Sequence, residues 1–257
     1  MKNDIDEELI RARERGYEIL CAPDAGEMLT LFGKLVADVS PQEKEGDSVC
    51  RDGVRRTLFH DGRCRCWLVE CGGKKYILKL DKRDRHRFDY LVQSFFLGSN
   101  AFRLLKTLHR AAKRGFDGAA RIFLVADKRR FGCTLHSFFL QEYVEGETLQ
   151  ETPPEFYRKY ADEAAGIIYA LHEFGCAHGD AHRGNFILEK KSGKLKVIDV
   201  GGKVPCASQK ATDRLRLQKE WGVKNTVFDH GYVIAVAYRS WRHLLDALRR
   251  KFREPAA

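Results

Sequence analysis

The chain has 257 residues, of which 44% are hydrophobic and 32% are charged, so it is long enough to bury a core as one domain or two closely joined lobes. Its net charge of +10 favours an anionic partner such as a nucleotide, a nucleic acid or an anionic lipid, although a basic surface also keeps a protein soluble. The charged start and the lack of a long apolar run exclude a signal peptide and a membrane span, so we expect a cytoplasmic protein.

Residues 1–45 are expected to form a helical extension. The charged start predicts a helix, and a second helix is predicted where EMLTLFGKLVAD, residues 27–38, spaces its apolar side chains by three and four. The polar linker SPQEKEGD follows this second helix. The sequence leaves open whether the extension caps the fold or binds a partner.

After this linker the pattern changes to short apolar runs separated by Asp-Gly and Gly-Gly turns. This pattern predicts three antiparallel strands, in VRRTLF, CRCWLVE and KKYILKL. Residues 88–112 have the apolar spacing of a helix, and further strands are expected at 122–126 and 137–144. We therefore expect residues 46–144 to form a small lobe with an antiparallel sheet.

Beyond two consecutive prolines the chain becomes mostly helical. Apolar residues from Phe156 to Leu171 form one helical stripe, which predicts a helix that ends near Gly175. Two short strands, FILE and LKVID, should follow it, and residues 145–257 should form a mainly helical lobe. The predicted fold class is α+β, with an antiparallel sheet first and helices second.

The stretch HGDAHRGNF, residues 178–186, gathers polar side chains in a loop between that helix and the first of the two strands. Asp180 and Asn185 lie five residues apart, and Asp199 ends the apolar run KVID. Two carboxylates and one amide on neighbouring loops offer the oxygen ligands that Mg²⁺ prefers. A single aspartate in a turn is usually a cap, but H-x-D-x-x-x-x-N followed by D-x-G is the spacing of a kinase catalytic loop and metal loop.

Phosphoryl transfer also requires groups that hold ATP. Kinases place a lysine on the third strand, and Lys79 in YILKL occupies that position, although a lysine on an edge strand facing water is the alternative. The segment LQEYVEGETL predicts a hinge between the lobes. There the backbone groups of Glu142, Tyr143 and Val144 would bond the adenine edge.

Two features depart from the kinase pattern. The sequence has no glutamate between Glu70 and Glu142, so Lys79 lacks the helix glutamate with which kinases pair this lysine. Phe102 falls at the expected place, and Asp89 would have to substitute unless the lysine is organised otherwise. The glycine-rich loop that covers the phosphates is also absent, so a kinase-like protein with weak catalysis remains an alternative.

Several motifs identify a smaller group of kinases. His182 stands where protein kinases usually have a lysine, and the loop resembles those of aminoglycoside and choline phosphotransferases. Over residues 175–251, DAHRGNFIL, IDVGGKVPCASQKATDRLRLQKEWGVKN and FDHGYVIAVAYRSWRHLLDALRRK resemble the bacterial lipopolysaccharide core heptose(II) kinase family. The resemblance is weaker over 64–150 and absent over about the first 45 residues.

This resemblance implies a protein-kinase-like two-lobed fold and transfer of the ATP γ-phosphate to a heptose hydroxyl of the lipopolysaccharide inner core. The reaction would take place at the cytoplasmic face of the inner membrane. Asp180 would orient or deprotonate the hydroxyl, Asn185 and Asp199 would bind Mg²⁺, and Lys79 would hold the ATP phosphates. Another acceptor, Kdo or an aminoglycoside-like sugar, is the alternative, as is a glycolipid-binding protein without turnover.

Three further residues have two interpretations each. His182 and Arg183 either touch the transferring phosphoryl group or the anionic acceptor, or they brace the loop. Asp229 in FDHGY resembles the kinase aspartate that accepts backbone N–H bonds from the catalytic loop, or it caps the helix that follows.

The C-terminal sequence from Tyr238 predicts a basic amphipathic helix. Its composition suits an anionic membrane surface, and it equally suits a last helix packed on the lobe with a solvated flank. The expected partner is a lipopolysaccharide core acceptor, and no nucleic acid is expected. The oligomeric state is left open.

Overall fold

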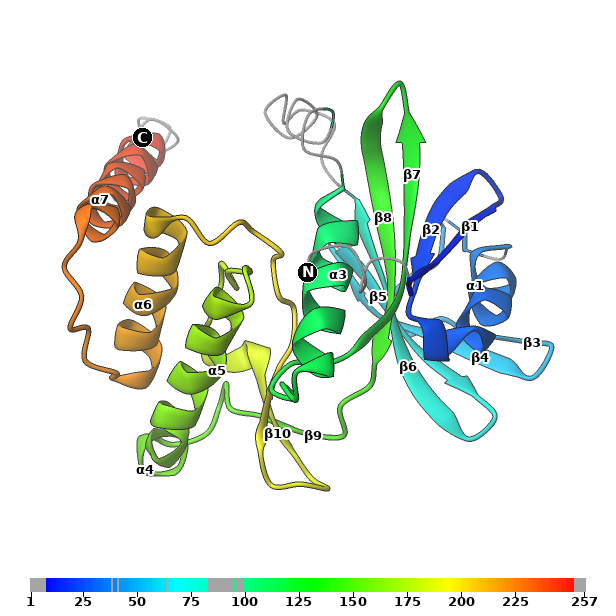
Figure 1. Cartoon of the computed structure of the whole chain (residues 1–257), viewed down its shortest axis with the longest axis horizontal. Helices are drawn as coiled ribbons and strands as arrows, with labels where there is room; N and C mark the ends of the chain where they lie inside the picture. Colours follow the sequence, from blue (N-terminus) through cyan, green and yellow to red (C-terminus); the bar gives the residue numbers. More distant parts are fainter. Residues whose placement is uncertain are drawn as a thin grey trace, which may run out of the picture.

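The protein, described from a computed structural model, has a lobe built on a large antiparallel sheet and a second lobe built mainly of helices (Figure 1). The structure describes residues 8–37, 39–40, 42–62, 64–82, 95 and 99–251. This arrangement confirms the predicted α+β architecture, in which the sheet comes first and the helices follow.

The sheet lobe contains, in chain order, strands β1 (Ile10–Glu14) and β2 (Tyr17–Cys21), the turn η1 (Pro23–Ala25), helix α1 (Glu27–Ala37), strands β3 (Ser48–Arg51), β4 (Val54–Asp61), β5 (Cys64–Cys71) and β6 (Lys74–Lys82), helix α3 (Asn100–Lys113), and strands β7 (Ile122–Arg130) and β8 (Cys133–Glu142). The strand order in the sheet is β1-β2-β7-β8-β6-β5-β4-β3, and every pair is antiparallel. The three strands predicted after the linker are β4, β5 and β6. The turn between β5 and β6 uses Gly72 and Gly73, whose φ angles of 57° and 73° match a two-residue hairpin.

The start of the chain extends this sheet, so the predicted helical extension is wrong over Ile10–Glu14. These residues form β1, which pairs with β2, and β2 pairs with β7. The sequence IRARE alternates apolar and charged side chains, and the partly buried Ile10 and Ala12 alternate with the exposed Arg11 and Arg13. A period of two fits a strand rather than a helix. The second predicted helix is confirmed as α1.

A buried cluster of charges ties the segment before β3 to the β4–β5 hairpin. Glu43 forms an ion pair with Arg56 and accepts a 2.8 Å hydrogen bond from the indole N–H of Trp67. Arg65 donates a 2.8 Å hydrogen bond to the backbone oxygen of Ser40. Arg56, Arg65 and Trp67 are almost completely buried. Because these polar groups have lost their water, their protein partners hold the hairpin in place.

The helical lobe contains strand β9 (Gly146–Thr148), helix α4 (Pro154–Tyr157), the turn η2 (Arg158–Tyr160), helix α5 (Ala161–Glu173), the turn η3 (Arg183–Asn185), strands β10 (Phe186–Glu189) and β11 (Leu195–Val197), and helices α6 (Ala207–Trp221) and α7 (His230–Lys251). Strands β9, β10 and β11 form a small second sheet of order β11-β10-β9. The predicted helix ending near Gly175 corresponds to α4, η2 and α5, and the two predicted short strands are β10 and β11. The predicted helix at 88–112 is confirmed from Asn100 onward as α3; its earlier residues lie almost entirely outside the described part of the chain.

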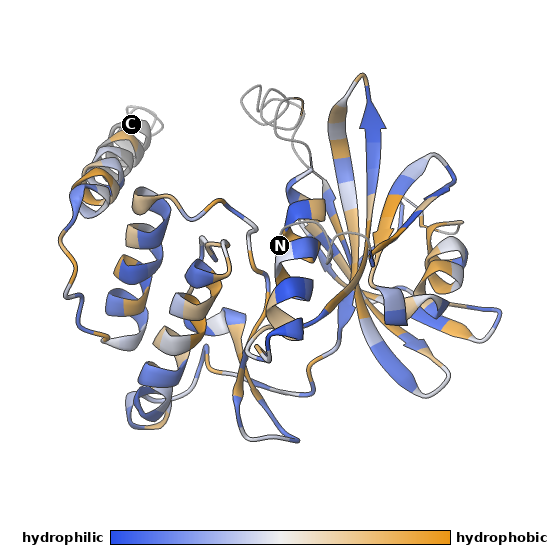
Figure 2. Ribbon diagram, in the orientation of Figure 1, coloured by the Kyte–Doolittle hydropathy of each residue, from blue (hydrophilic) through white to orange (hydrophobic). Residues whose placement is uncertain are grey.

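Two hydrophobic clusters hold the lobes. One lies between the sheet and α1 and includes Phe32 and Trp67, while the other joins α3 and β7 to α5, β10 and α6 through residues such as Leu105, Ile168 and Trp221. Figure 2 shows hydrophobic residues along the middle of the central strands and hydrophilic residues at the ends of β6 and β7. Since the second cluster spans both lobes, it fixes α3 against the loops of the helical lobe. In the described part of the chain, no helix is both long and apolar enough to cross a membrane.

Removing the negative charge of Glu43 should strongly destabilise the protein. The change Glu43→Gln leaves the guanidinium of Arg56 buried without its counter-charge, so we expect the free energy of unfolding to fall by about 3 kcal/mol. Urea denaturation measures this fall. The matched change Glu45→Gln, at an exposed glutamate two residues away, should cost less than about 1 kcal/mol. Equal effects of the two variants would contradict the role given to Glu43.

Candidate active site

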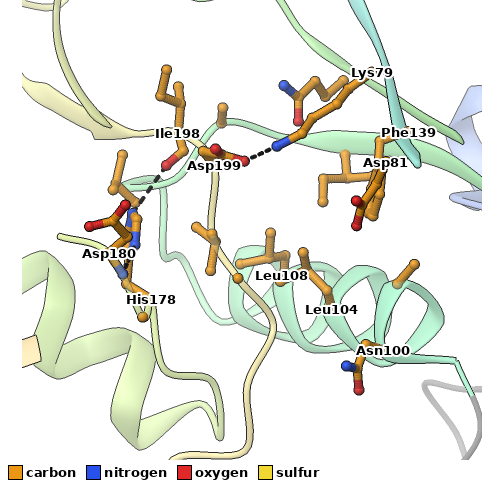
Figure 3. A pocket seen from close by; sticks show the side chains of 18 of the residues that line it. Lys79, Asp81, Asn100, Leu104, Leu108, Phe139, His178, Asp180, Ile198 and Asp199 are labelled. Carbon is orange, nitrogen blue, oxygen red and sulfur yellow. Dashed lines mark hydrogen bonds and ion pairs between the residues drawn. The ribbon is translucent and has the colours of Figure 1, made fainter. Parts of the chain in front are cut away.

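A cavity of about 230 Å³ lies where the sheet lobe faces two loops of the helical lobe. Strand β6 contributes Lys79, helix α3 contributes Leu104 and Leu108, and the two loops contribute Asp180 and Asp199 (Figure 3). Three of the predicted site residues, Lys79, Asp180 and Asp199, therefore line one cavity although they lie up to 120 positions apart in the sequence.

Lys79 projects from an interior strand. It pairs in register with Cys66 of β5 on one side and with Phe139 of β8 on the other, so the alternative of an edge-strand lysine is wrong. Its ammonium group forms an ion pair with the carboxylate of Asp199 (Figure 3). Burial alone would lower the pKa of Lys79, but the charge and hydrogen bond of Asp199 outweigh it, and the pKa is raised. Lys79 is therefore a charged group at a largely buried position.

The sequence did not determine which acidic residue pairs with Lys79. Asp89 lies outside the described residues, and Phe102 lies in the first turn of α3, which begins at Asn100. Among the residues that the structure describes, the acid paired with Lys79 is Asp199. Within the described residues, the lysine is thus organised by the aspartate that ends the run KVID.

Asp199 occupies an unusual backbone conformation. Its φ of 57° is in the left-handed region, which a residue other than glycine adopts only when its surroundings hold it there. Backbone hydrogen bonds on both sides hold it: Ile198 donates to Asn185 at 2.8 Å, and Gly201 donates to His178 at 2.9 Å. The loop that carries Asp199 is thereby tied to the loop that carries Asp180.

The buried ring of His178 also joins these two loops. Its Nδ1 accepts a 3.2 Å hydrogen bond from the backbone N–H of Asp180, so Nε2 carries the proton and donates to the backbone oxygen of Ile198 at 3.1 Å. This arrangement requires a neutral imidazole. Burial lowers the pKa of His178, which keeps the ring in that form.

Asp180 and Asn185 are joined within the loop. The side-chain N–H of Asn185 donates a 2.9 Å hydrogen bond to the backbone oxygen of Asp180. The amide oxygen of Asn185 accepts no hydrogen bond from any residue that the structure describes, so it is available to a ligand. The Asp180 side chain is 54% exposed, so a substrate can reach its carboxylate.

Asp213 of α6 fixes the backbone of this loop. Its carboxylate accepts hydrogen bonds from the backbone N–H of His178 at 2.9 Å, from that of Gly179 at 2.7 Å, and from the ring of His172 at 2.9 Å. The residue is completely buried. An ionised carboxylate at such a site is stable only with several donors, and these three donors set the path of the chain just before Asp180.

The prediction that Asp229 supports the catalytic loop is therefore wrong, and its alternative role as a cap is confirmed. Asp229 stands just before α7, where it accepts a 2.8 Å hydrogen bond from the backbone N–H of Tyr232 and pairs with Arg214 at 3.1 Å. Asp213 was visible in the sequence in the segment Lys-x-x-Asp-Arg. Three aspartates, Asp213, Asp229 and Asp246, follow the metal loop in the sequence, and local spacing did not identify Asp213 among them.

His182 and Arg183 make the contacts expected of bracing residues. The ring of His182 lies 3.9 Å from the Asp180 carboxylate, and Arg183 stacks over the ring of Tyr157 at 4.2 Å and lies 3.9 Å from Glu220. Neither residue lines the cavity. The guanidinium of Arg183 lies between Tyr157 and Glu220, outside the cavity.

The hinge residues lie at the end of β8. Glu142 uses its backbone N–H on Arg121 at 2.8 Å and its carboxylate on Lys196 at 2.7 Å. The backbone groups of Tyr143 and Val144 have no hydrogen-bond partner among the described residues, so they are free to bond a ligand. None of these three hinge residues lines the cavity that contains Lys79.

Sequence reasoning did not identify Arg216 as a site residue. From α6, its guanidinium lies 3.1 Å from the Asp180 carboxylate and 3.7 Å from Glu220. No motif marks this arginine, because its partner lies 36 positions earlier in the chain and only the packing of α6 brings the two together.

The side-chain oxygens at the site fit a Mg²⁺ ion that shares its ligands with a substrate better than they fit a metal held by protein side chains alone. In the described part of the chain, no group of three or more His, Cys, Asp or Glu side chains could hold a metal ion. The carboxylate of Asp199 lines the cavity, whereas Asn185, on the neighbouring loop, does not. Mg²⁺ is usually bound by one or two carboxylates together with water and substrate phosphates, so this partial set suits it.

Comparison with known proteins gives matches over most of the chain. The family model described as "Lipopolysaccharide core biosynthesis protein (WaaY)" matches residues 57–251. A lipopolysaccharide core heptose(II) kinase of Escherichia coli K12 is 29% identical over 184 residues, which cover 72% of this chain and 78% of the relative. A second Escherichia coli protein of the same description is 28% identical over 186 residues, with 72% and 79% covered.

Among solved structures, the PknI kinase domain of Mycobacterium tuberculosis aligns with a TM-score of 0.41 and 15% identity, covering 73% of this chain and 80% of that domain. Vaccinia related kinase 3 aligns with a TM-score of 0.38 and 17% identity, covering 67% and 55%.

The change Asp213→Asn should loosen the catalytic loop. An amide can accept from only one of the two backbone N–H groups and turns its own N–H₂ toward the other, so we expect the free energy of unfolding to fall by about 2–3 kcal/mol. Amide hydrogen exchange at His178 and Gly179 should become faster. Asp229→Asn is the matched control: it removes a carboxylate that pairs with Arg214 and caps α7 but bonds neither His178 nor Gly179, so amide exchange at these two residues should stay as in the wild type. A larger effect at Asp229 would return the supporting role to that residue.

Proposed function

Because the chain belongs to the lipopolysaccharide core biosynthesis protein (WaaY) family, whose model covers residues 57–251, we propose that it phosphorylates a heptose hydroxyl of the lipopolysaccharide inner core with ATP. It is a phosphotransferase, and the relatives described as heptose(II) kinases support this acceptor. The observation that carries the proposal is the convergence of Lys79, Asp180 and Asp199 on one cavity.

Asp180 is the group that receives the acceptor. Its exposed carboxylate would accept a hydrogen bond from the hydroxyl and draw off its proton as the oxygen attacks the γ-phosphorus. Asp213 holds the backbone just before it, and the ring of His178 accepts a hydrogen bond from its own backbone N–H, so the carboxylate is placed before the substrate arrives. Arg183 and His182 brace the same loop.

Lys79, Asn185 and Asp199 would hold the nucleotide. The ammonium of Lys79 would contact the α- and β-phosphates, and Asn185 and Asp199 would ligate Mg²⁺. Magnesium bound there would offset the negative charge of the phosphate oxygens. The free backbone groups of Tyr143 and Val144 would bond the adenine edge, whereas the backbone N–H of Glu142 is already used on Arg121.

The Asp180→Ala variant tests the catalytic assignment. ADP release with Mg²⁺ and a heptose-containing core acceptor should fall at least about 100-fold, because the general base is lost. The exposed Glu151→Ala serves as the charge-matched control and should keep the wild-type rate. Phosphate mapping on the purified product should place the new phosphate on a heptose.

Each other outcome is informative. A wild-type rate that survives the loss of Asp180 would remove this aspartate from the mechanism. Release that depends on Kdo or on aminoglycosides instead of the heptose acceptor would reassign the acceptor. If none of these acceptors supports ADP release, the proposed activity is contradicted.

We propose further that the protein works at the inner, cytoplasmic face of an anionic membrane, where the acceptor is anchored, and that α7 contacts the lipid. Helix α7 packs on α6 where the backbone of Gly231 closely approaches Ala207, so one side of it is buried. Ile234, Tyr238 and Trp241, spaced by four and three, lie on another side and are 54%, 62% and 57% exposed. Tryptophan and tyrosine favour the membrane interface, and the net charge of +10 is attracted by anionic lipid.

The double change Ile234→Ser and Trp241→Ser should weaken binding to vesicles of phosphatidylcholine and phosphatidylglycerol at least about tenfold, since each side chain contributes about 1.5 kcal/mol or more when buried. Co-sedimentation with the vesicles measures this binding. The control is Phe131→Ser, because Phe131 is an aromatic residue exposed at the β7–β8 turn of the other lobe. No binding by the wild type, or equal loss in the control, would overturn the assignment of α7.

A further inference from the structure

Asp180 is already engaged by a cation. Arg216 contacts it at 3.1 Å, and the same guanidinium lies 3.7 Å from Glu220, which in turn lies 3.9 Å from Arg183. The four side chains form a row of alternating charge that ends at Asp180. An acceptor hydroxyl that approaches Asp180 therefore competes with Arg216 for the carboxylate.

A second cation lies beside the same loop. Lys203 lines the cavity, and its side chain lies against Gly179, the residue just before Asp180. The φ of Gly179 is 84°, and a side chain added there would meet Lys203 at 3.2 Å, so the glycine makes room for the lysine. Lys203 forms no ion pair with any acid in the described part of the chain.

The fold does not require Arg216 in its present position. A half-exposed ion pair contributes at most about 1 kcal/mol to stability, and the Arg216 side chain is 33% exposed. Arg214, two positions earlier on α6, is almost buried and is fixed by Asp229. Arg216 can leave Asp180 at little cost in stability, whereas Arg214 cannot leave Asp229.

From these contacts we infer that Arg216 and Lys203 form a subsite for an anionic group of the acceptor, a phosphate or a carboxylate, and that this group draws Arg216 away from Asp180. This inference rests on the proposed function and adds a determinant of specificity to it. A planar guanidinium binds either anion through two parallel hydrogen bonds.

Once released, Asp180 takes the proton of the acceptor hydroxyl. The acceptor oxygen forms a bond to the γ-phosphorus of ATP, and the bond from that phosphorus to the β-γ bridging oxygen breaks, with its electron pair leaving on ADP. An acceptor without the anion leaves Asp180 bound to Arg216. Arg216 is thus a positioning residue for Asp180 and a binding residue for the acceptor.

The test measures acceptor binding by calorimetry without nucleotide, in parallel with ADP release. The probes are a heptose-containing core acceptor, the same acceptor after phosphatase treatment, and the same acceptor with its carboxyl groups reduced. We expect Arg216→Gln to raise the Kd for the intact acceptor at least tenfold and to leave the KM for ATP unchanged, with partial rescue by Arg216→Lys. Lys219→Gln, an exposed lysine on the same helix, is the matched control and should behave as wild type.

The two modified acceptors identify the anion. The modified acceptor that binds the wild type and the Arg216→Gln variant with the same Kd is the acceptor that lacks the group recognised by the subsite. If all three acceptors bind the variant as they bind the wild type, the subsite is overturned while the proposed function stands. Charge-dependent binding through Arg216 without ADP release would overturn the activity and keep the subsite, and no binding by the wild type would overturn both.

Discussion

The structure of the site depends on one buried carboxylate. Asp213 is completely buried and accepts three hydrogen bonds, two of them from the backbone of consecutive residues, His178 and Gly179. Each hydrogen bond to a charged group contributes about 1.5–3 kcal/mol, so leaving either donor unpaired would be costly. Since those two backbone groups precede Asp180 directly, helix α6 determines where the carboxylate of Asp180 lies.

The second constraint joins the lobes. Strand β11, which leads into Asp199, forms backbone hydrogen bonds with Gly118 and Ala120 at the entrance to β7. Asp199 itself pairs with Lys79 of the sheet. Nucleotide phosphates and Mg²⁺ would bind the same two side chains, so binding would replace one direct ion pair by contacts that both partners make with the ligand. The pair keeps both charges compensated in the structure.

The fold and the centre of the site follow from local sequence signals, while the supporting residues do not. Glycine turns and apolar periodicity located the strands β4 to β6 and the helices α1 and α5, and the spacing of Asp180, Asn185 and Asp199 located the two loops. The strand β1 was missed because charge was weighed above the period of two in IRARE. Asp213 was confused with Asp229 because both are aspartates beyond the metal loop, and only the packing of α6 decides between them.

The positive charges beside Asp180 explain how the basic surface of the protein can select an acceptor. Around Asp180, the cations Arg216 and Lys203 stand beside the loop, and the remaining arginine, Arg183, is occupied by Tyr157 and Glu220. A neutral sugar gains nothing from the two cations and must displace Arg216 from Asp180. An anionic saccharide offers Arg216 a new negative partner when it displaces this arginine from Asp180. The energetic cost of freeing Asp180 therefore falls only for an acceptor that carries a negative charge.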